Sequence, residues 1–132
     1  SNANADITRT IIGHLDRTYT DLKDLLELAS SGCFLEYDLF GIEVSYFPLA
    51  EADMASDAQR LDFIQFLVDA GYQNRIVIAQ DICRKERLVK YGGYGYAHIL
   101  ENIVPWLLDR GLSPDQIDGI TIRNPAEILA FA

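Results

Sequence analysis

The sequence is poor in basic residues and in cysteine. It contains 11 lysine and arginine residues against 20 aspartate and glutamate residues, and its formal net charge at pH 7 is −9. This balance argues against a nucleic acid or an anionic membrane as partner, because both require a concentrated positive surface. The only cysteines are Cys33 and Cys83. Two cysteines beside predicted strands fit reduced thiols in a cytoplasmic protein better than a disulfide framework.

The sequence also lacks long hydrophobic runs. No apolar stretch approaches the ~18 residues of a membrane-spanning helix, and no signal peptide is recognisable. Hydrophobic residues make up 49% of the 132 positions and charged residues 23%, which is typical of one soluble globular domain. Ser1–Ala3 resembles a remnant of tag cleavage. We therefore expect a single domain over residues 4–132, and a natural protein longer than this sequence.

The most informative stretch is the short apolar run Ile76–Ala79, which leads to Asp81. A β-rich run with little alternation suits a parallel strand that is covered on both faces. Asp81 stands where this strand should end. In parallel α/β folds the carboxyl ends of the strands carry the chemistry, so a carboxylate at this position is a candidate functional group.

The hydrophobic pattern predicts a β-α-β-α-β-α order. Strands are predicted over residues 10–13, 33–37 and 76–79. Helices are predicted over residues 19–30, 57–70 and 97–110, with short helices towards the C-terminus. Strands joined through helices must pair in parallel with right-handed crossovers. The sequence therefore predicts a parallel α/β domain, or a piece of one.

Several residues mark the expected helix ends. Thr18, with Asp21 three positions later, resembles a capping box for the first helix. Ser113–Pro114 and Asn124–Pro125 each resemble an N-cap followed by proline at the first helical position. Pro105 lies inside the third predicted helix and should kink or split it.

Two long loops follow the second and third strands. A long structureless loop is unusual in a compact domain unless it is functional. The basic residues from Arg84 to Lys90 either attract an anionic substrate or form a solvated face. The glycine-rich segment Tyr91–Tyr96 does not have phosphate-loop spacing, and we interpret it as an aromatic wall or lid. His98 is interpreted as an ordinary helix-start histidine and Trp106 as a core residue.

Each predicted strand ends on a titratable residue, namely His14, Asp38 or Asp81. In one parallel sheet these three ends point to the same edge. A histidine and two carboxylates there could bind a divalent metal or act as general acid and base. Alternatively, each residue caps a loop or helix by hydrogen bonding, since Asp and His are common at such turns.

Six segments, in this order, resemble the C-terminal part of the phosphotriesterase family, within the metal-dependent amidohydrolase superfamily. They are Gly13–Asp16, Asp38, Ala79–Asp81, Tyr96–Ile99, Ile103–Leu107 and Ile122–Ala126. The phosphotriesterase-related proteins are the most similar group. The resemblance implies a (β/α)8 TIM barrel with two metals, often zinc, at its mouth. It also implies that the three strands are barrel strands six, seven and eight.

The resemblance assigns roles to individual residues. His14 matches a metal ligand, and Asp81 matches a catalytic residue that binds metal and takes a proton from the attacking water. Asp38, Arg84 and Tyr96 are expected to contact a small-molecule substrate. A metal pair lowers the pKa of water and polarises the scissile bond of an ester, lactone or amide.

One neighbouring position departs from the family pattern. Leu39 stands where phosphotriesterases have histidine and lactonases have arginine. Organophosphate turnover is therefore not expected, and the natural substrate is left open.

The family's remaining metal ligands lie on earlier barrel strands that this sequence does not contain. The first hypothesis is therefore a metal-dependent hydrolase, represented by a C-terminal fragment that is inactive alone. The second is a non-catalytic half-barrel that forms homo-oligomers through open sheet edges, or pairs with a missing N-terminal half. The third is a small α/β module whose loops bind a metabolite. Metal bound at His14 and Asp81 favours the first, and a metal-free dimer favours the second.

Overall fold

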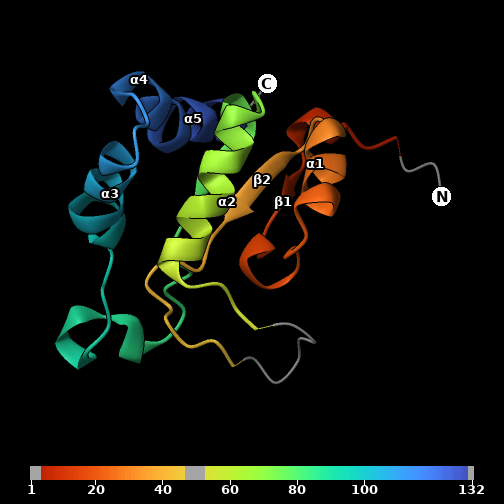
Figure 1. Cartoon of the computed structure of the whole chain (residues 1–132). Coiled ribbons are helices and arrows are strands. Elements are labelled where there is room, and N and C mark those ends of the chain that lie inside the picture. Colours follow the sequence, from red (N-terminus) through yellow and green to blue (C-terminus); the bar gives the residue numbers. More distant parts are fainter. Residues whose placement is uncertain (1–3, 47–52, 131–132) are drawn as a thin grey trace.

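Three parallel strands lie at the centre of the described part of the chain, which comprises residues 4–46 and 53–130 of a computed structural model (Figure 1). The strands are β1 (Ile11–Ile12), β2 (Phe34–Tyr37) and β3 (Ile76–Ile78). They pair in the order β1-β2-β3, and both pairs are parallel. The predicted parallel α/β sheet is confirmed, and each strand is slightly shorter than predicted. The expected tag remnant lies outside the described residues.

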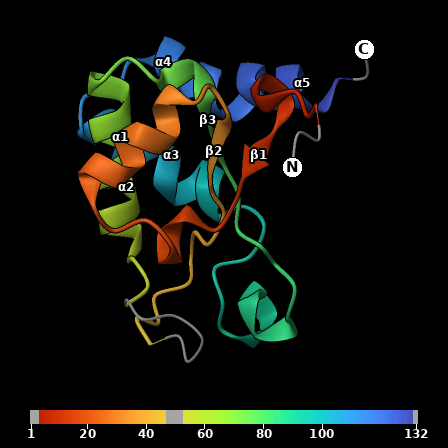
Figure 2. The same cartoon turned by 90° about the vertical axis from the view of Figure 1, so that its right-hand side faces the viewer.

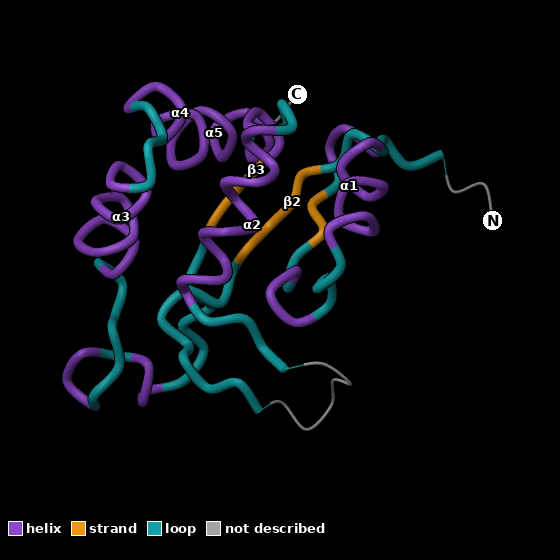
Figure 3. Tube along the Cα trace, in the orientation of Figure 1, coloured by secondary structure: helices purple, strands orange, loops and turns teal. Residues whose placement is uncertain are grey.

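The helices cover one face of this sheet and the end at which its strands begin. They are α1 (Leu22–Ser30), α2 (Asp57–Asp69), α3 (Val104–Asp109), α4 (Pro114–Asp118) and α5 (Asn124–Leu129). Figure 2 shows α1, α2 and α3 on one side of the strands, with α4 and α5 at the strands' amino ends. Figure 3 shows that the long loops gather at the opposite end. Among the described residues, no helix has the length and apolarity needed to cross a membrane.

The strand register determines which side chains of β2 enter the core. Leu35 pairs with Ile76 and Tyr37 with Ile78, and both β2 residues belong to the buried cluster beneath the helices. Because successive strand side chains point to opposite faces, Glu36 faces the other side of the sheet. The core is completed by side chains of α1, α2 and α3 that are fully buried, including Leu25, Leu61, Ile64, Leu67 and Leu107.

The first helix begins at Leu22, three residues later than predicted. Its N-cap is Asp21, whose carboxylate accepts hydrogen bonds from two amide groups of the first turn at 2.8 and 3.2 Å. Thr18 ends a preceding 3₁₀ turn instead, and its hydroxyl donates to the carbonyl of His14 at 2.9 Å. The predicted capping box at Thr18 is therefore wrong, because the Asp21 carboxylate satisfies the free amide groups.

Two prolines follow π-helical turns. Pro105 is the second residue of α3, directly after the π turn Ile99–Ile103, and Pro125 is the second residue of α5, after the π turn Gly119–Arg123. Proline has no amide hydrogen, and its ring clashes with the carbonyl four residues earlier in an ordinary α-helix. The wider π turn accommodates that clash. The sequence predicts that Pro105 kinks or splits its helix; it does not split it, because the helical backbone runs on from the π turn through Val104 into α3.

Asn124 does not cap a new helix, contrary to prediction. It has helical backbone angles because the preceding π turn continues into α5. Its buried side-chain amide donates to the carbonyls of Gln73 and Ile76, at 2.8 and 2.7 Å. Asn124 therefore ties α5 to the start of β3.

The prediction that Trp106 is a core residue is also wrong. Its side chain is 41% exposed, whereas Leu107 is completely buried. The π turn adds a residue to the helical repeat and so rotates the following turn, which directs Leu107 to the core. The guanidinium of Arg110 lies 5.6 Å from the centre of the Trp106 ring.

The buried hydroxyl of Tyr37 has no hydrogen-bond partner among the described residues, and its ring stacks on Phe63. We expect Tyr37→Phe to raise the free energy of unfolding by about 0.5–1 kcal/mol, because a desolvated, unpaired hydroxyl is removed. Urea denaturation measures this, with Tyr91→Phe at an exposed position as a control without effect. A lower stability of Tyr37→Phe would show that the hydroxyl has a partner.

Candidate active site

The sheet topology brings three predicted site residues to one edge. His14 follows β1, Asp38 follows β2, and Asp81 lies shortly after β3. The β2–β3 pairing continues to Ala79, whose amide donates to the carbonyl of Tyr37 at 2.9 Å. Because the strands are parallel, their carboxyl ends share an edge, with β1 and β3 roughly 10 Å apart across it. Asp38 lies at the end of the central strand, between the other two.

Asp38 orients His14 through both carboxylate oxygens. The backbone amide of His14 donates to Oδ2 at 3.2 Å, and the ring nitrogen Nδ1 lies 2.7 Å from Oδ1. An ionised carboxylate only accepts hydrogen bonds, so the proton of the neutral ring is on Nδ1 and Nε2 carries a lone pair. Metal-binding histidines commonly have such a carboxylate on their second nitrogen. This geometry prepares Nε2 of His14 to act as a ligand.

His14 and Asp81 share an unusual backbone conformation. Their φ angles are +57° and +45°, in the left-handed region, and among the described residues Asn4 is the only other non-glycine with positive φ. Such strain costs of order 1–3 kcal/mol per residue and concentrates at functional sites. The two residues predicted to bind metal are therefore the two strained residues at the ends of the strands.

Arg87 contacts Asp81 at two points. Its Nη1 lies 3.2 Å from Oδ2 of the carboxylate and also donates to the Asp81 carbonyl. The other carboxylate oxygen, Oδ1, makes no hydrogen bond to the described residues. Asp81 is thus held in its strained conformation while one oxygen stays available.

A cavity of about 590 Å³ opens beside Asp81. Residues of the two long loops complete its lining, which includes the basic residues Arg17, Arg84 and Arg87 and the acidic residues Glu43, Asp81 and Glu86. The predicted substrate-binding residue Arg84 therefore lines the same cavity as Asp81. Tyr96 does not line this cavity: its side chain is exposed, and its carbonyl accepts a hydrogen bond from a neighbouring glutamine.

Glu36 is a site residue that sequence reasoning missed. A Cβ atom on Gly13 would lie only 2.8 Å from Oε2 of Glu36 and 3.0 Å from Oδ2 of Asp38, so glycine lets both carboxylates approach the chain. Burial and, next, the negative charge of Asp38 raise the pKa of the Glu36 carboxyl, and His14 opposes part of this rise. The signal in the sequence that could have identified Glu36 is its position as a charged residue in an otherwise apolar central strand.

We expect Glu36→Gln to stabilise the fold at neutral pH. A raised pKa means that wild-type stability falls as pH rises through the folded-state pKa of Glu36, and glutamine has no such loss. The gain should be absent below the ordinary glutamate pKa of ~4.3 and should grow towards neutrality. Because Glu36 is only partly buried, the gain in the free energy of unfolding should stay below about 1 kcal/mol. Denaturation at several pH values measures it, and a pH-independent difference would contradict it.

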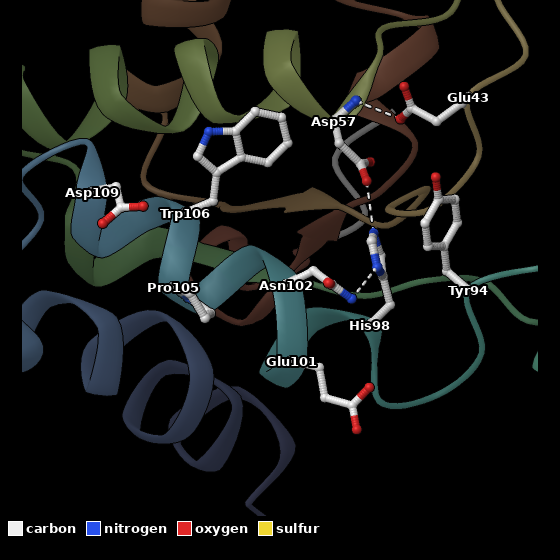
Figure 4. A pocket seen from close by; sticks show the side chains of 9 residues that line it. All are labelled: Glu43, Asp57, Tyr94, His98, Glu101, Asn102, Pro105, Trp106 and Asp109. Carbon is white, nitrogen blue, oxygen red and sulfur yellow. Dashed lines mark hydrogen bonds and ion pairs between the residues drawn. The ribbon is translucent and has the colours of Figure 1, made fainter.

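His98 differs from its interpretation as an ordinary helix-start histidine. It is buried, its Nε2 lies 2.7 Å from Oδ2 of Asp57, and its Nδ1 lies 3.1 Å from the amide nitrogen of Asn102. Figure 4 shows the ring between these two partners, with Tyr94 alongside. His98 lines a second cavity, of about 510 Å³, which Trp106 also lines.

The donors at the sheet edge fit a metal in kind but not in number. A neutral imidazole nitrogen and a carboxylate are ordinary ligands of zinc and related metals. Within residues 4–46 and 53–130, however, no group of three or more His, Cys, Asp or Glu side chains could hold a metal ion. A metal bound by His14 and Asp81 needs at least one further protein ligand from outside the described residues.

Sequence comparison relates this chain to hydrolases. It matches the family model described as "Phosphotriesterase family" over residues 1–129. It is 53% identical over 130 residues to the N-acetyltaurine hydrolase of Mus musculus and 49% identical to that of Homo sapiens. A phosphotriesterase-related protein of Nematostella vectensis is 51% identical. Each match covers 98% of this chain and 37% of the relative, so the chain spans little more than a third of these proteins' length.

Solved structures show the same relationship. A resiniferatoxin-binding protein from Rhodobacter sphaeroides superimposes with a TM-score of 0.87 at 31% identity, over 94% of this chain and 34% of that one. The phosphotriesterase homology protein from Escherichia coli, complexed with phosphate in its active site, gives 0.82 at 29% identity, over 96% and 40%. The predicted fold, part of a TIM barrel of this kind, is confirmed. The chain belongs to the phosphotriesterase family.

Proposed function

We propose that this chain supplies part of the active site of a metal-dependent hydrolase that cleaves the amide bond of a small N-acyl substrate. One observation carries the proposal. His14 and Asp81, both in strained left-handed conformations, stand at the same edge of the sheet, and His14 is oriented by a carboxylate. The relationship to hydrolases of the same family supports it.

In this proposal, Nε2 of His14 and the carboxylate of Asp81 hold a metal, most simply zinc, together with ligands outside this chain. Bound metal supplies a lowered pKa for water and polarisation of the substrate carbonyl. Asp81 accepts the proton of the attacking water. Asp38 keeps the imidazole of His14 in the tautomer that leaves Nε2 unprotonated.

The cavity beside Asp81 contains three guanidinium groups that could bind the anionic end of a substrate. Acidic residues line it as well: Arg84 lies 3.8 Å from Glu86, and Arg87 lies 3.2 Å from Asp81. Arg17, Arg84 and Arg87 line the cavity, and the planar guanidinium group suits sulfonate, carboxylate and phosphate oxygens. Several relatives are named N-acetyltaurine hydrolase, and N-acetyltaurine is an N-acyl amine with a sulfonate end. We therefore propose N-acyl amino sulfonates and N-acyl amino carboxylates as the substrate class. The exposed Tyr96 would join this site only if the loop before α3 moves.

A chimeric protein tests the proposed function. In it, this sequence replaces the matching segment of the mouse N-acetyltaurine hydrolase, with which it aligns over 130 residues. We expect the chimera to hydrolyse N-acetyltaurine or another N-acyl amino acid. A folded chimera that binds metal but hydrolyses none of a panel of N-acyl amino sulfonates and carboxylates would contradict the proposed function.

The second candidate function is assembly through the sheet edges. β1 and β3 are the outer strands of the described sheet, and Ile11 on β1 is 37% exposed. Open edges with apolar side chains promote pairing with another chain. We expect the 132-residue chain to elute as a dimer or larger species in size-exclusion chromatography with light scattering. A monomer at high protein concentration would count against this candidate.

The cytoplasm is the proposed place of action. Cys33 is buried and Cys83 exposed, and both are free thiols in the structure. Free thiols persist in a reducing compartment.

A further inference from the structure

Arg60 on α2 is completely buried, which is rare for arginine. Its Nε donates to Oδ1 of Asp16 at 2.5 Å, and its Nη1 donates to Oδ1 of Asp57 at 2.6 Å. Its Nη2 donates to the carbonyl of Ile42 at 3.1 Å. All three nitrogens of the guanidinium are therefore satisfied, and two buried carboxylates share one cation.

The Asp16 end of this arrangement reaches the candidate active site. The second oxygen of Asp16, Oδ2, accepts a hydrogen bond from the backbone amide of Asp38 at 3.1 Å. The carboxylate of Asp38 in turn binds the amide and the ring of His14. Asp16 thus fixes the backbone of the residue that orients His14. Burial raises the pKa of the Asp16 carboxyl, and the Arg60 charge offsets part of that rise.

The Asp57 end reaches the loops after β2 and β3. Asp57 accepts hydrogen bonds from the amide of Gly41, at 3.0 and 3.2 Å, and from Nε2 of His98 at 2.7 Å. The ring of Tyr94 lies 4.4 Å from that of His98, centre to centre. Figure 4 shows His98 directed at Asp57. One continuous set of hydrogen bonds therefore joins the segments that follow all three strands.

We infer that the Asp16–Arg60–Asp57 network is a positioning device that fixes Asp38, and through it the ring of His14, for the hydrolase site. The inference rests on the proposed function. A buried ionic network is weak evidence for stability, because apolar residues of similar volume often serve the core equally well. Here the network ends on Asp38, the residue that sets the tautomer of His14. Apolar residues in place of the network could not hold the backbone amide of Asp38.

Histidine NMR tests this inference in the 132-residue chain, because His14 and His98 are its only two histidines. The measurement is made at the alkaline end of a pH series, where the signals of both rings no longer change with pH. The two carboxylate partners require opposite tautomers. We expect the proton on Nδ1 of His14 and on Nε2 of His98. A wild-type His14 with its proton on Nε2, or on both nitrogens in rapid exchange, overturns the inference.

The variant Asp16→Asn separates positioning from bulk stability. Asp16 accepts from Arg60 and from the Asp38 amide, whereas an asparagine offers one oxygen, so one of these donors loses its acceptor in either orientation of the side-chain amide. We expect the His14 signals to shift towards a mixture of tautomers, while His98 keeps its proton on Nε2. Unchanged His14 signals in a destabilised Asp16→Asn protein mean that the network is only structural, and overturn the inference.

The control is Asp62→Asn on the same helix, where the carboxylate is 67% exposed and pairs with Arg110. It should leave both histidine spectra unchanged. If Asp16→Asn does not fold, Arg60→Lys replaces it, because lysine keeps the charge but loses the bond from Nε. We expect the same shift of the His14 signals in Arg60→Lys, and unchanged His14 signals in that variant would overturn the inference.

The two proposals can fail separately. The NMR experiment involves no metal and no substrate, so it does not depend on turnover. In the chimera, Asp16→Asn should lower kcat at least about tenfold with little change in KM, as expected for a lost orientation effect. If the chimera shows no turnover while the His14 signals still shift in the 132-residue chain, the proposed function fails and the positioning inference stands.

Discussion

We expect Arg60→Met to lower the free energy of unfolding by about 3–5 kcal/mol, the cost of breaking a buried ion pair from one side. Methionine fills much of the arginine volume, so the main loss is electrostatic. Asp16 and Asp57, which both hydrogen-bond to Arg60 in the interior, are left without their shared cation.

Chemical denaturation measures this change, and Arg110→Met is the matched control. Arg110 pairs with Asp62, where their side chains are 25% and 67% exposed, and it also donates to the carbonyl of Ala58 and lies over the Trp106 ring. An exposed pair of this kind contributes at most about 1 kcal/mol. If Arg60→Met lowers the free energy of unfolding no more than Arg110→Met does, the charge of Arg60 does not stabilise the carboxylates of Asp16 and Asp57.

Asp81→Asn in the chimera should lower kcat by about 10²–10⁴-fold, the usual contribution of a general base. The same change should leave the stability of the fold unchanged or slightly higher. Asp81 has a φ of +45°, and asparagine tolerates the left-handed region well. Loss of activity without loss of stability is the expected signature of a residue that is strained for function.

Turnover kinetics and denaturation of the same samples provide the test. Asp24→Asn, in the first turn of α1 and exposed, is the control, and it should keep full activity. An Asp81→Asn chimera with wild-type kcat would remove Asp81 from the mechanism. A chimera that loses both activity and stability would make the residue structural.

The positions of His14, Asp38 and Asp81 could be predicted because they depend on local signals. Short apolar runs mark the strands, and helices between strands require parallel pairing. Parallel pairing alone places the ends of β1, β2 and β3 at one edge. The titratable residue after each strand could therefore be placed at this edge without knowledge of tertiary contacts.

The buried network could not be predicted, because its bonds join distant residues. Arg60 and Asp16 are 44 positions apart, and His98 and Asp57 are 41 positions apart. An arginine on a helix is usually exposed and a histidine is intermediate, and nothing in the neighbouring sequence marks Arg60 or His98 as buried. Their burial follows from the way α2 and the loops pack together, which a single sequence does not reveal.

The errors at Trp106 and Asn124 have a common physical cause. Both residues lie beside a proline that follows a π turn. At Trp106, a regular repeat of about 3.6 residues assigns the wrong face because the π turn adds a residue. At Asn124, the π turn continues into α5, so no new helix begins there for the side chain to cap. Only the position of the proline was visible in the sequence.

Metal analysis of the chimera tests the central claim, that this chain supplies ligands of a hydrolytic metal site. Elemental analysis after dialysis would compare the chimera with its His14→Ala and Asp81→Ala double variant. We predict metal close to stoichiometric in the parent chimera and a large loss in the folded double variant. A folded double variant with the full metal content and normal turnover would show that His14 and Asp81 are not ligands, and would contradict the proposed site.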